Sequence, residues 1–299
     1  MSILHFTSSE LKLHNTNSVL MLRFIHRKSS QKNQQLYTLN STENLLNEVN
    51  YNVKIKTLFY IHGYKENLTT ESTQTIIDAY LRRNDHNVIV LNWGPYANGS
   101  YMTHAVPNLV KLGKLVGSSM YEWLKKEVFQ LKELHIVGHS LGAHLGGYIT
   151  RAVSTLSKYE MKIHRLTGLD PALPLFYPKL FFFPTAISAD DANFVDIIHS
   201  DAGSLGAPNA TGTVDFWPNG GLEQPGCINS TERNLTEYCG ELNVVISFPF
   251  FKHIVITADH GTFGLNTFFT VKCENFEEFK QNKCDGNTIV EMGINSQSG

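Results

Sequence analysis

The sequence has little charge, and its charges of opposite sign nearly cancel. Only 17% of the 299 residues are Asp, Glu, Lys or Arg, fewer than the roughly 25% of a typical globular domain. The 25 basic and 27 acidic side chains leave a formal net charge of −2. A nucleic-acid-binding protein needs concentrated basic charge to displace the counterions of the phosphates. The composition therefore argues against a nucleic acid as partner.

The sequence also lacks a long apolar run. No stretch reaches the 18 or so apolar residues that span a bilayer, and the longest candidate, residues 244–256, is interrupted by Pro249, Lys252 and His253. We therefore expect no transmembrane segment. Hydrophobic residues nevertheless make up 42% of the chain, with 18 Phe and 12 Tyr, which is unlike the composition of a disordered protein.

Cysteine is scarce, with too few residues for a disulfide-built scaffold. The four cysteines all lie in the last quarter of the chain, at Cys227, Cys239, Cys273 and Cys284. Four cysteines allow three pairings. Closure of the two short loops, 227–239 and 273–284, is the natural choice, and four buried free thiols are the alternative.

Six Asn-x-Ser/Thr glycosylation sequons favour secretion. They lie at Asn40, Asn67, Asn98, Asn209, Asn229 and Asn234. The first residues, Met-Ser-Ile-Leu-His-Phe, have no basic flank followed by an apolar run of signal-peptide length. Either the signal peptide is not part of this sequence or the protein is not secreted. We expect a secreted, extracellular protein.

Strand-like and helix-like segments alternate after about residue 50. Apolar runs predict strands at residues 53–61, 87–92, 134–137, 166–169 and 194–198. Helical spacing is found at residues 70–82, 107–126 and 141–156. This alternation is typical of an α/β fold with a mostly parallel, doubly wound sheet. We expect a single domain over residues 1–299, with an N-terminal extension and edge strands in 1–50 and a flexible tail in 285–299.

Residues 138–142 read Gly-His-Ser-Leu-Gly, between a predicted strand and a predicted helix. The pattern Gly-x-Ser-x-Gly occurs by chance about one time in ten in a chain of this length, but this context is that of a nucleophile elbow, a sharp turn with a strained central residue. The two glycines let the strand and the helix approach each other without a Cβ clash. Ser140 would then lie at a helix N-terminus, where N–H groups favour an oxyanion. An ordinary turn with Ser140 as helix cap is the alternative.

A serine hydroxyl is a weak nucleophile that needs a base, and the base needs an orienting acid. In α/β-hydrolases the order along the chain is Ser, acid, His. Asp170 is the best-placed carboxylate, because it ends a predicted strand at the edge where open α/β sheets bind ligands; a turn-capping role is the alternative. Among the downstream histidines, His199 is more typical of a satisfied core residue, whereas spacing alone does not separate His253 from His260.

A second oxyanion donor must come from a loop after an early strand. Residues 60–64 read Tyr-Ile-His-Gly-Tyr, and Gly63 would let the main chain turn so that the N–H of Tyr64 points at the substrate oxygen. The N–H of Leu141 would be the other donor. A plain turn at the end of a strand is the alternative.

Several further segments join these motifs in a recurring order. They read His-Gly-Tyr at 62–64, Asn-Val-Ile-Val-Leu-Asn-Trp at 87–93, Val-Gly-His-Ser-Leu-Gly-Ala-His at 137–144, Gly-Leu-Asp-Pro-Ala at 168–172, Asp-Ala-Asn-Phe-Val-Asp-Ile-Ile-His at 191–199, Val-Asp-Phe-Trp-Pro-Asn-Gly-Gly at 214–221 and Gln-Pro-Gly-Cys at 224–227. Together they resemble the animal neutral lipases, or pancreatic lipase family, which includes secreted phospholipases A1. The resemblance implies an α/β-hydrolase with Ser140 as nucleophile, Asp170 as acid, Tyr64 and Leu141 as oxyanion donors, and a lid loop closed by a disulfide from Cys227.

The resemblance also selects the base. The family usually has a Cys two residues before its catalytic His and another about twenty residues after it. Cys273 fits the later spacing from His253, which is therefore chosen over His260. The preceding cysteine, Cys239, is fourteen residues back, and residues 240–252 have no counterpart in the family. We interpret them, as a hypothesis, as a retained intron or a private insertion that could move His253 out of reach.

Cofactors and partners follow from the same comparison. The structural calcium site of some members uses a Glu, an Arg and two Asp. Here only Asp191 clearly remains, with Ala186 and Ser188 at neighbouring matching positions, so we expect no metal and no other cofactor. The C-terminal β-sandwich domain of pancreatic lipases has no match in the sequence, so no colipase-like partner is expected.

The expected activity is hydrolysis of a lipid carboxyl ester, in a phospholipid or an acylglycerol, at a membrane or lipid-droplet interface. Short lids accompany phospholipase A1 activity in the family, and eleven residues separate Cys227 from Cys239, which favours phospholipase A1 over triacylglycerol lipase. A catalytically inactive lipid-binding or storage protein on the same scaffold is the alternative, and residues 240–252 argue for it.

Overall fold

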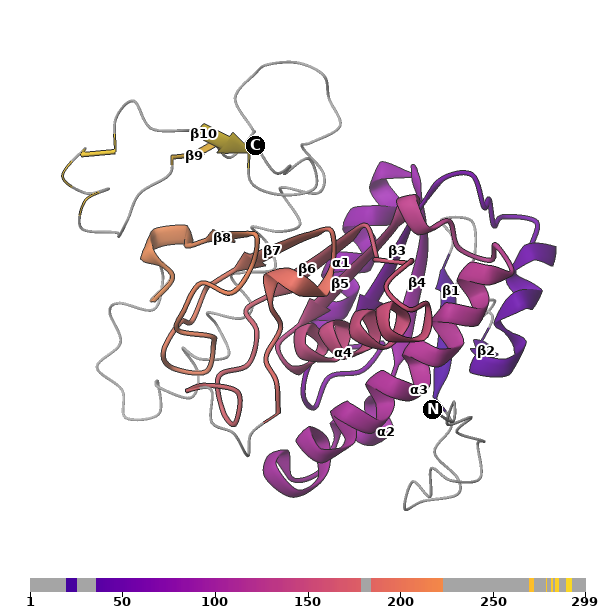
Figure 1. Cartoon of the computed structure of the whole chain (residues 1–299), viewed down its shortest axis with the longest axis horizontal. Helices are drawn as coiled ribbons and strands as arrows, with labels where there is room; N and C mark the ends of the chain where they lie inside the picture. The colour runs from indigo at the N-terminus through magenta and orange to yellow at the C-terminus, as the bar shows by residue number, and fades with distance from the viewer. Residues whose placement is uncertain are drawn as a thin grey trace.

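An eight-stranded β-sheet is the centre of the described structure, with its strands in the order β2-β1-β4-β3-β5-β6-β7-β8 (Figure 1). The parallel part consists of β3 (Lys56–Ile61), β4 (His86–Asn92), β5 (Leu134–His139), β6 (Arg165–Leu169), β7 (Phe194–Ile198) and β8 (Val214–Phe216). At one edge, β1 (Met21–Ile25) pairs antiparallel with β4, and β2 (Leu36–Thr38) pairs antiparallel with β1. This computed structural model describes residues 20–25, 36–178, 184–222, 269–271, 278, 281, 283, 284 and 289–291.

Helices follow the strands along the described part of the chain. The α-helices are α1 (Glu71–Arg83), α2 (Gly94–Ala97), α3 (Val106–Lys125) and α4 (Leu141–Leu156). Shorter helical turns are η2 (Leu39–Asn47), η3 (Tyr101–Ala105), η4 (Leu131–Glu133), η5 (Ala189–Asp191) and η6 (Pro218–Gly220). Separately from the large sheet, β9 (Phe269–Val271) and β10 (Ile289–Glu291) form an antiparallel pair. None of the helices in the described ranges is both long and apolar enough to cross a membrane.

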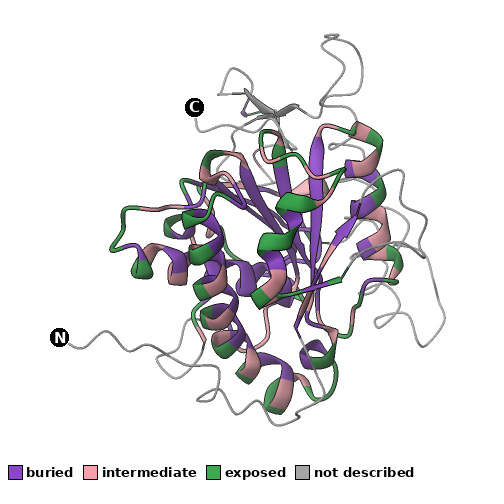
Figure 2. Ribbon diagram, turned by 90° about the vertical axis from the view of Figure 1, so that its right-hand side faces the viewer, coloured by how far each residue is buried: buried purple, intermediate pink, exposed green. Residues whose placement is uncertain are grey.

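Two apolar cores lie on opposite faces of the sheet, because successive residues of a strand point to opposite sides. Phe59 and Ile61 of β3 belong to the core that includes α3 and α4, whereas Leu58 and Tyr60 belong to the core that includes α1. Figure 1 shows α3 and α4 side by side in front of the sheet. Figure 2 shows the buried strands in the centre of the molecule, with helices around them whose outward sides are exposed. The arrangement is a three-layer α/β/α fold.

The fold class predicted from the sequence, an α/β fold with a mostly parallel sheet, is confirmed. The predicted strand at 194–198 and helix at 141–156 have the bounds of β7 and α4. The strand expected at 53–61 begins only at Lys56, because residues 53–55 form a turn and a bend. β5 continues two residues beyond its apolar run, through His139, and so reaches the residue before Ser140.

Two glycines let α4 begin directly against the sheet. A Cβ placed on Gly138 would lie 2.3 Å from the carbonyl oxygen of Gly142, and one placed on Gly142 would lie 2.3 Å from the carbonyl oxygen of Ile61. Both neighbours are main-chain atoms, which cannot rotate away as a side-chain end can. The sequence interpretation, that these glycines allow a close approach of strand and helix, is confirmed.

This contact predicts a large loss of stability for the Gly142→Ala variant. The added methyl group must push α4 away from the end of β3, and overpacking of this kind costs about 3 kcal/mol. Urea unfolding of the variant and the parent protein measures the difference. Thr155→Ala, at an exposed position near the end of the same helix, is the control and should change the unfolding free energy by less than about 0.5 kcal/mol. A loss for Gly142→Ala no larger than that of the control would contradict the packing argument.

Candidate active site

Ser140 is the single residue between β5 and α4, and its main chain is strained. Its φ of 51° and ψ of −118° lie in a sparsely populated region that costs a non-glycine residue about 1–3 kcal/mol. The turn is held by the Ser140 N–H, which donates to the carbonyl of Leu169 at 2.9 Å, and by the Ala143 N–H, which donates to the carbonyl of Ser140 at 3.2 Å. The hydroxyl-bearing residue therefore sits on a sharp bend at the N-terminus of a 16-residue helix.

Asp170 directly follows β6, the neighbour of β5 in the sheet, and is buried. Its Oδ1 accepts the N–H groups of Ser200 at 2.9 Å and Asp201 at 3.1 Å. Among the described residues none donates to Oδ2. Burial raises the pKa of Asp170 in spite of the two N–H groups. The carboxylate is therefore fixed by one oxygen, and its second oxygen is available to a donor such as an imidazole N–H.

His199 is committed to the interior of the fold. Its Nδ1 contacts the carbonyl oxygen of Ala207 at 2.9 Å, its Nε2 contacts Oδ1 of Asp215 at 2.8 Å, and its ring stacks on Trp217 with centroids 3.6 Å apart. Both ring nitrogens are therefore satisfied, and the sequence interpretation of His199 as a satisfied core residue is confirmed.

Several predicted site residues lie outside the described residues: the base His253, its alternative His260, and the cysteines Cys227, Cys239 and Cys273. Their roles stay predictions. Cys284 is buried and disulfide-bonded. The structure thus brings Ser140 and Asp170 to the ends of adjacent strands and leaves the identity of the base to be tested.

The loop after β3 lies directly against Ser140. A Cβ placed on Gly63 would be 3.1 Å from the Cβ of Ser140 and 2.8 Å from Nδ1 of His139. The φ of Gly63 is not in the left-handed region, and the space between Ser140 and His139 is what requires a glycine at this position. Tyr64 follows in the same loop, and Leu141 is the first residue of α4, where N–H groups have no acceptor within the helix.

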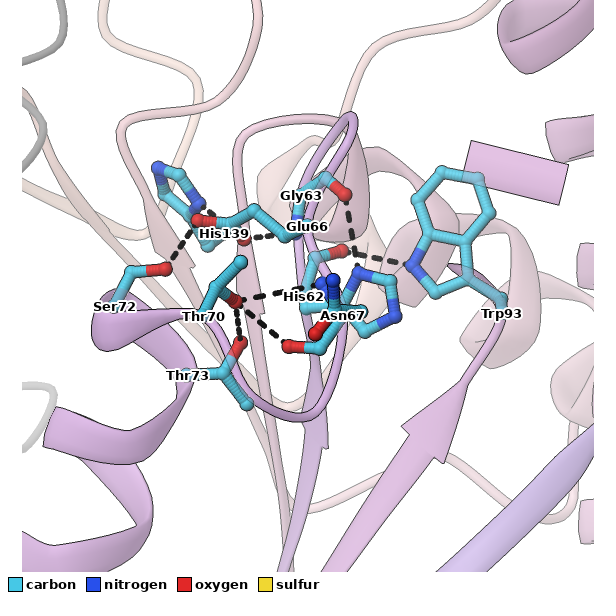
Figure 3. Close-up of polar contacts among 9 residues, drawn as sticks. All are labelled: His62, Gly63, Glu66, Asn67, Thr70, Ser72, Thr73, Trp93 and His139. Carbon is cyan, nitrogen blue, oxygen red and sulfur yellow. Dashed lines mark hydrogen bonds and ion pairs between the residues drawn. The ribbon is translucent and has the colours of Figure 1, made fainter. Parts of the chain in front are cut away.

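A carboxylate that the sequence analysis missed joins the loop to the elbow. Glu66 Oε2 accepts the N–H of Gly63 and contacts Nδ1 of His139 at 3.0 Å, and Oε1 accepts the Ser72 hydroxyl. Figure 3 shows Glu66 between these groups. Burial by itself raises the pKa of Glu66, but the His139 ring and the three hydrogen bonds outweigh it and lower the pKa to about 2. Glu66 is therefore an ionised carboxylate at neutral pH.

His62, the residue before Gly63 in this loop, is held in place by Trp93. The indole Nε1 of Trp93 donates to the carbonyl of His62 at 2.8 Å, and the two rings stack with centroids 5.6 Å apart. The His62 Nδ1–H donates to the carbonyl of Gly63 at 3.1 Å. Burial lowers the pKa of His62, so this imidazole is neutral. No periodicity or motif in the sequence marks Glu66 or Trp93 as partners of this loop.

The carboxylate of Asp191, expected from the resemblance as the remnant of a calcium site, binds a guanidinium. Arg151 of α4 contacts Asp191 through Nε–Oδ1 and Nη2–Oδ2, both at 2.7 Å, and its Nη2 and Nη1 donate to the carbonyls of Ala186 at 2.5 Å and Thr185 at 3.4 Å. In the described ranges, no group of three or more His, Cys, Asp or Glu side chains is placed to hold a metal ion. The residues at this position therefore do not fit a divalent cation, because the positively charged side chain of Arg151 already binds their oxygens.

This pairing predicts that calcium does not stabilise the protein. Millimolar calcium or a chelator should move the melting temperature by less than about 1 °C, because Arg151 takes both oxygens of Asp191. Arg151→Ala should lower the unfolding free energy by about 3 kcal/mol, since it leaves a buried carboxylate unpaired. Arg82→Ala, at an exposed position of α1, is the control. Differential scanning calorimetry measures these effects, and a calcium-dependent rise of several degrees in the parent protein would contradict the fit.

Comparisons with known proteins show the family to which the chain belongs. The family model described as Lipase matches residues 3–298. The chain is 33% identical to a putative endothelial lipase of Crotalus adamanteus over 89% of this chain and 53% of that protein. It is 32% identical to phospholipase A1 member A of Bos taurus over 78% of this chain and 47% of that protein, and 34% identical to lipoprotein lipase of Rattus norvegicus over 78% and 49%. The chain spans about half the length of these relatives. It belongs to the lipase family.

Proposed function

We propose that this protein hydrolyses carboxyl esters of lipids with a Ser140–His253–Asp170 triad. The observation that carries the proposal is the strained main chain of Ser140 at the start of α4, with the loop of Gly63 packed against it. Asp170, at the end of the next strand, keeps one carboxylate oxygen for a further donor. The relatives named lipase and phospholipase A1 support the reaction class.

In the proposed reaction, the Ser140 hydroxyl attacks the acyl carbonyl carbon while His253 takes its proton and Asp170 holds the imidazole. The N–H groups of Tyr64 and Leu141 stabilise the oxyanion, each by about 3 kcal/mol. The tetrahedral intermediate collapses, and the leaving alcohol receives the proton from His253. Water then gives a proton to His253 and attacks the acyl carbon, and the Ser140 oxygen leaves with that proton as the fatty acid is released. Because burial raises the pKa of Asp170, a positively charged imidazolium beside it would stabilise its ionised form.

Phospholipid is the substrate class we favour over triacylglycerol, because the eleven residues between Cys227 and Cys239 make a short lid that leaves room for a polar head group. We also propose an extracellular location. Four of the six sequon asparagines lie in the described residues, and all four are exposed: Asn40, Asn67, Asn98 and Asn209. Exposed sequons and a disulfide at Cys284 are both typical of secreted proteins.

The triad predicts that Ser140→Ala abolishes hydrolysis and covalent labelling together. The parent protein should react with a fluorophosphonate at Ser140, located by mass spectrometry of the labelled peptide. The variant should lose at least about 10⁴-fold in kcat while its circular dichroism spectrum stays unchanged. Hydrolysis retained by a folded Ser140→Ala variant would refute the nucleophile.

The substrate preference predicts faster release of fatty acid from phosphatidylcholine vesicles than from a trioleoylglycerol emulsion. The assay compares the full chain with a form that lacks residues 240–252, in which Cys239 and His253 become neighbours. If these residues displace His253, the shorter form is the faster enzyme on both lipids. Lipid binding without hydrolysis or labelling by either form would favour the inactive lipid-binding alternative. Transcripts that carry the codons of 240–252 in every tissue would exclude a retained intron.

A further inference from the structure

The two halves of the proposed oxyanion hole come from neighbouring parallel strands. Ile61, the last residue of β3, lies beside Gly138 of β5 in the register of the sheet. The loop of residues 62–70 and the elbow at Ser140 therefore start from adjacent points of the same sheet edge. The pairing of β3 with β5 ends here, so beyond this point side-chain contacts add to the main-chain packing of Gly142 on Ile61 in holding the loop beside the elbow.

Glu66 supplies such a contact. A single oxygen, Oε2, accepts the Gly63 N–H and the His139 ring N–H, as Figure 3 shows. Gly63 is the residue before Tyr64, and His139 is the residue before Ser140. One carboxylate oxygen therefore holds the two residues that precede the proposed oxyanion donor and the proposed nucleophile.

The contact is strong because it is charged and shielded from solvent. The Glu66 side chain is 13% exposed and that of His139 is 5% exposed. Three donors surround the carboxylate, the third being the Ser72 hydroxyl at the start of α1. Hydrogen bonds to an ionised acceptor are about twice as strong as those between neutral groups, so this carboxylate is suited to hold a loop within the narrow tolerance that catalysis requires.

We propose that Glu66 is a positioning residue of this hydrolase, which aligns the N–H of Tyr64 with the Ser140 hydroxyl by holding Gly63 and His139 on one oxygen. The proposal rests on the proposed function. Rotation of the Gly63–Tyr64 peptide would turn its N–H away from the oxyanion. Because the negative charge on the substrate oxygen develops only in the transition state, misalignment lowers kcat and leaves substrate binding nearly unchanged.

The test compares kcat and KM of two Glu66 variants on phosphatidylcholine vesicles. Glu66→Gln keeps the size of the side chain but removes its charge, and Glu66→Asp keeps the charge but shortens the reach to Gly63 and His139. Each variant should lower kcat about 10- to 100-fold and change KM by less than about twofold. The rate of fluorophosphonate labelling at Ser140 should fall in parallel, and the melting temperature of each variant shows whether it is folded.

Thr70→Ala is the matched control, because Thr70 stabilises the far end of the same loop. Its hydroxyl contacts the carbonyl of Asn67 at 2.7 Å and the Thr73 hydroxyl at 3.0 Å, without contact to Glu66. This variant should lose stability and keep kcat within about threefold. An unchanged kcat in either folded Glu66 variant, or an equal fall of kcat in Thr70→Ala, overturns the positioning role. A parent protein that neither hydrolyses lipid nor reacts with the fluorophosphonate contradicts the proposed function itself, and with it the role of Glu66.

Discussion

The contact between the end of β3 and the first turn of α4 is the constraint on which the rest of the site depends. Gly142 packs on the main chain of Ile61 with no room for a methyl group. This closeness brings the loop that follows β3 to within van der Waals contact of the elbow, where Gly63 lies against Ser140. The strain at Ser140 persists because main-chain hydrogen bonds to Leu169 and from Ala143 hold the turn on both sides. Packing of backbone on backbone therefore sets the geometry, and side chains such as Glu66 refine it.

The long apolar elements were predictable from the sequence, and the short ones were not. The helix at 141–156 and the strand at 194–198 are rich in apolar residues along their whole length, so their bounds could be read from the sequence. β8 escaped prediction because it has three residues, of which only Phe216 is buried, too few to reveal a period. The start of β3 was missed because the alternation of apolar residues continues backward through residues 53–55 although the chain turns there.

The site, too, was predictable only in part: residues in local sequence patterns could be predicted, and contacts between distant residues could not. Ser140 and Asp170 were predicted because each stands at a fixed place in a local pattern after a strand, Ser140 two residues from a glycine on either side and Asp170 directly before Pro171. Glu66 was not found because its partner His139 is 73 residues away in the sequence, and such a pair is fixed only by the packing of β3 beside β5. Gly63 was singled out as a residue at which the chain turns, and its closeness to Ser140 and His139 could not be seen in the sequence, because both are more than 70 residues away.

The pairing of Arg151 with Asp191 has a consequence for the environment in which the fold holds together. A bound metal ion exchanges with solvent, so the structure it supports follows the ion's concentration and fails when a stronger binder competes for it. A guanidinium that belongs to the polypeptide cannot be diluted or extracted. The segment of residues 185–191, which borders α4, is consequently held by an attachment that does not depend on the concentration of a metal ion.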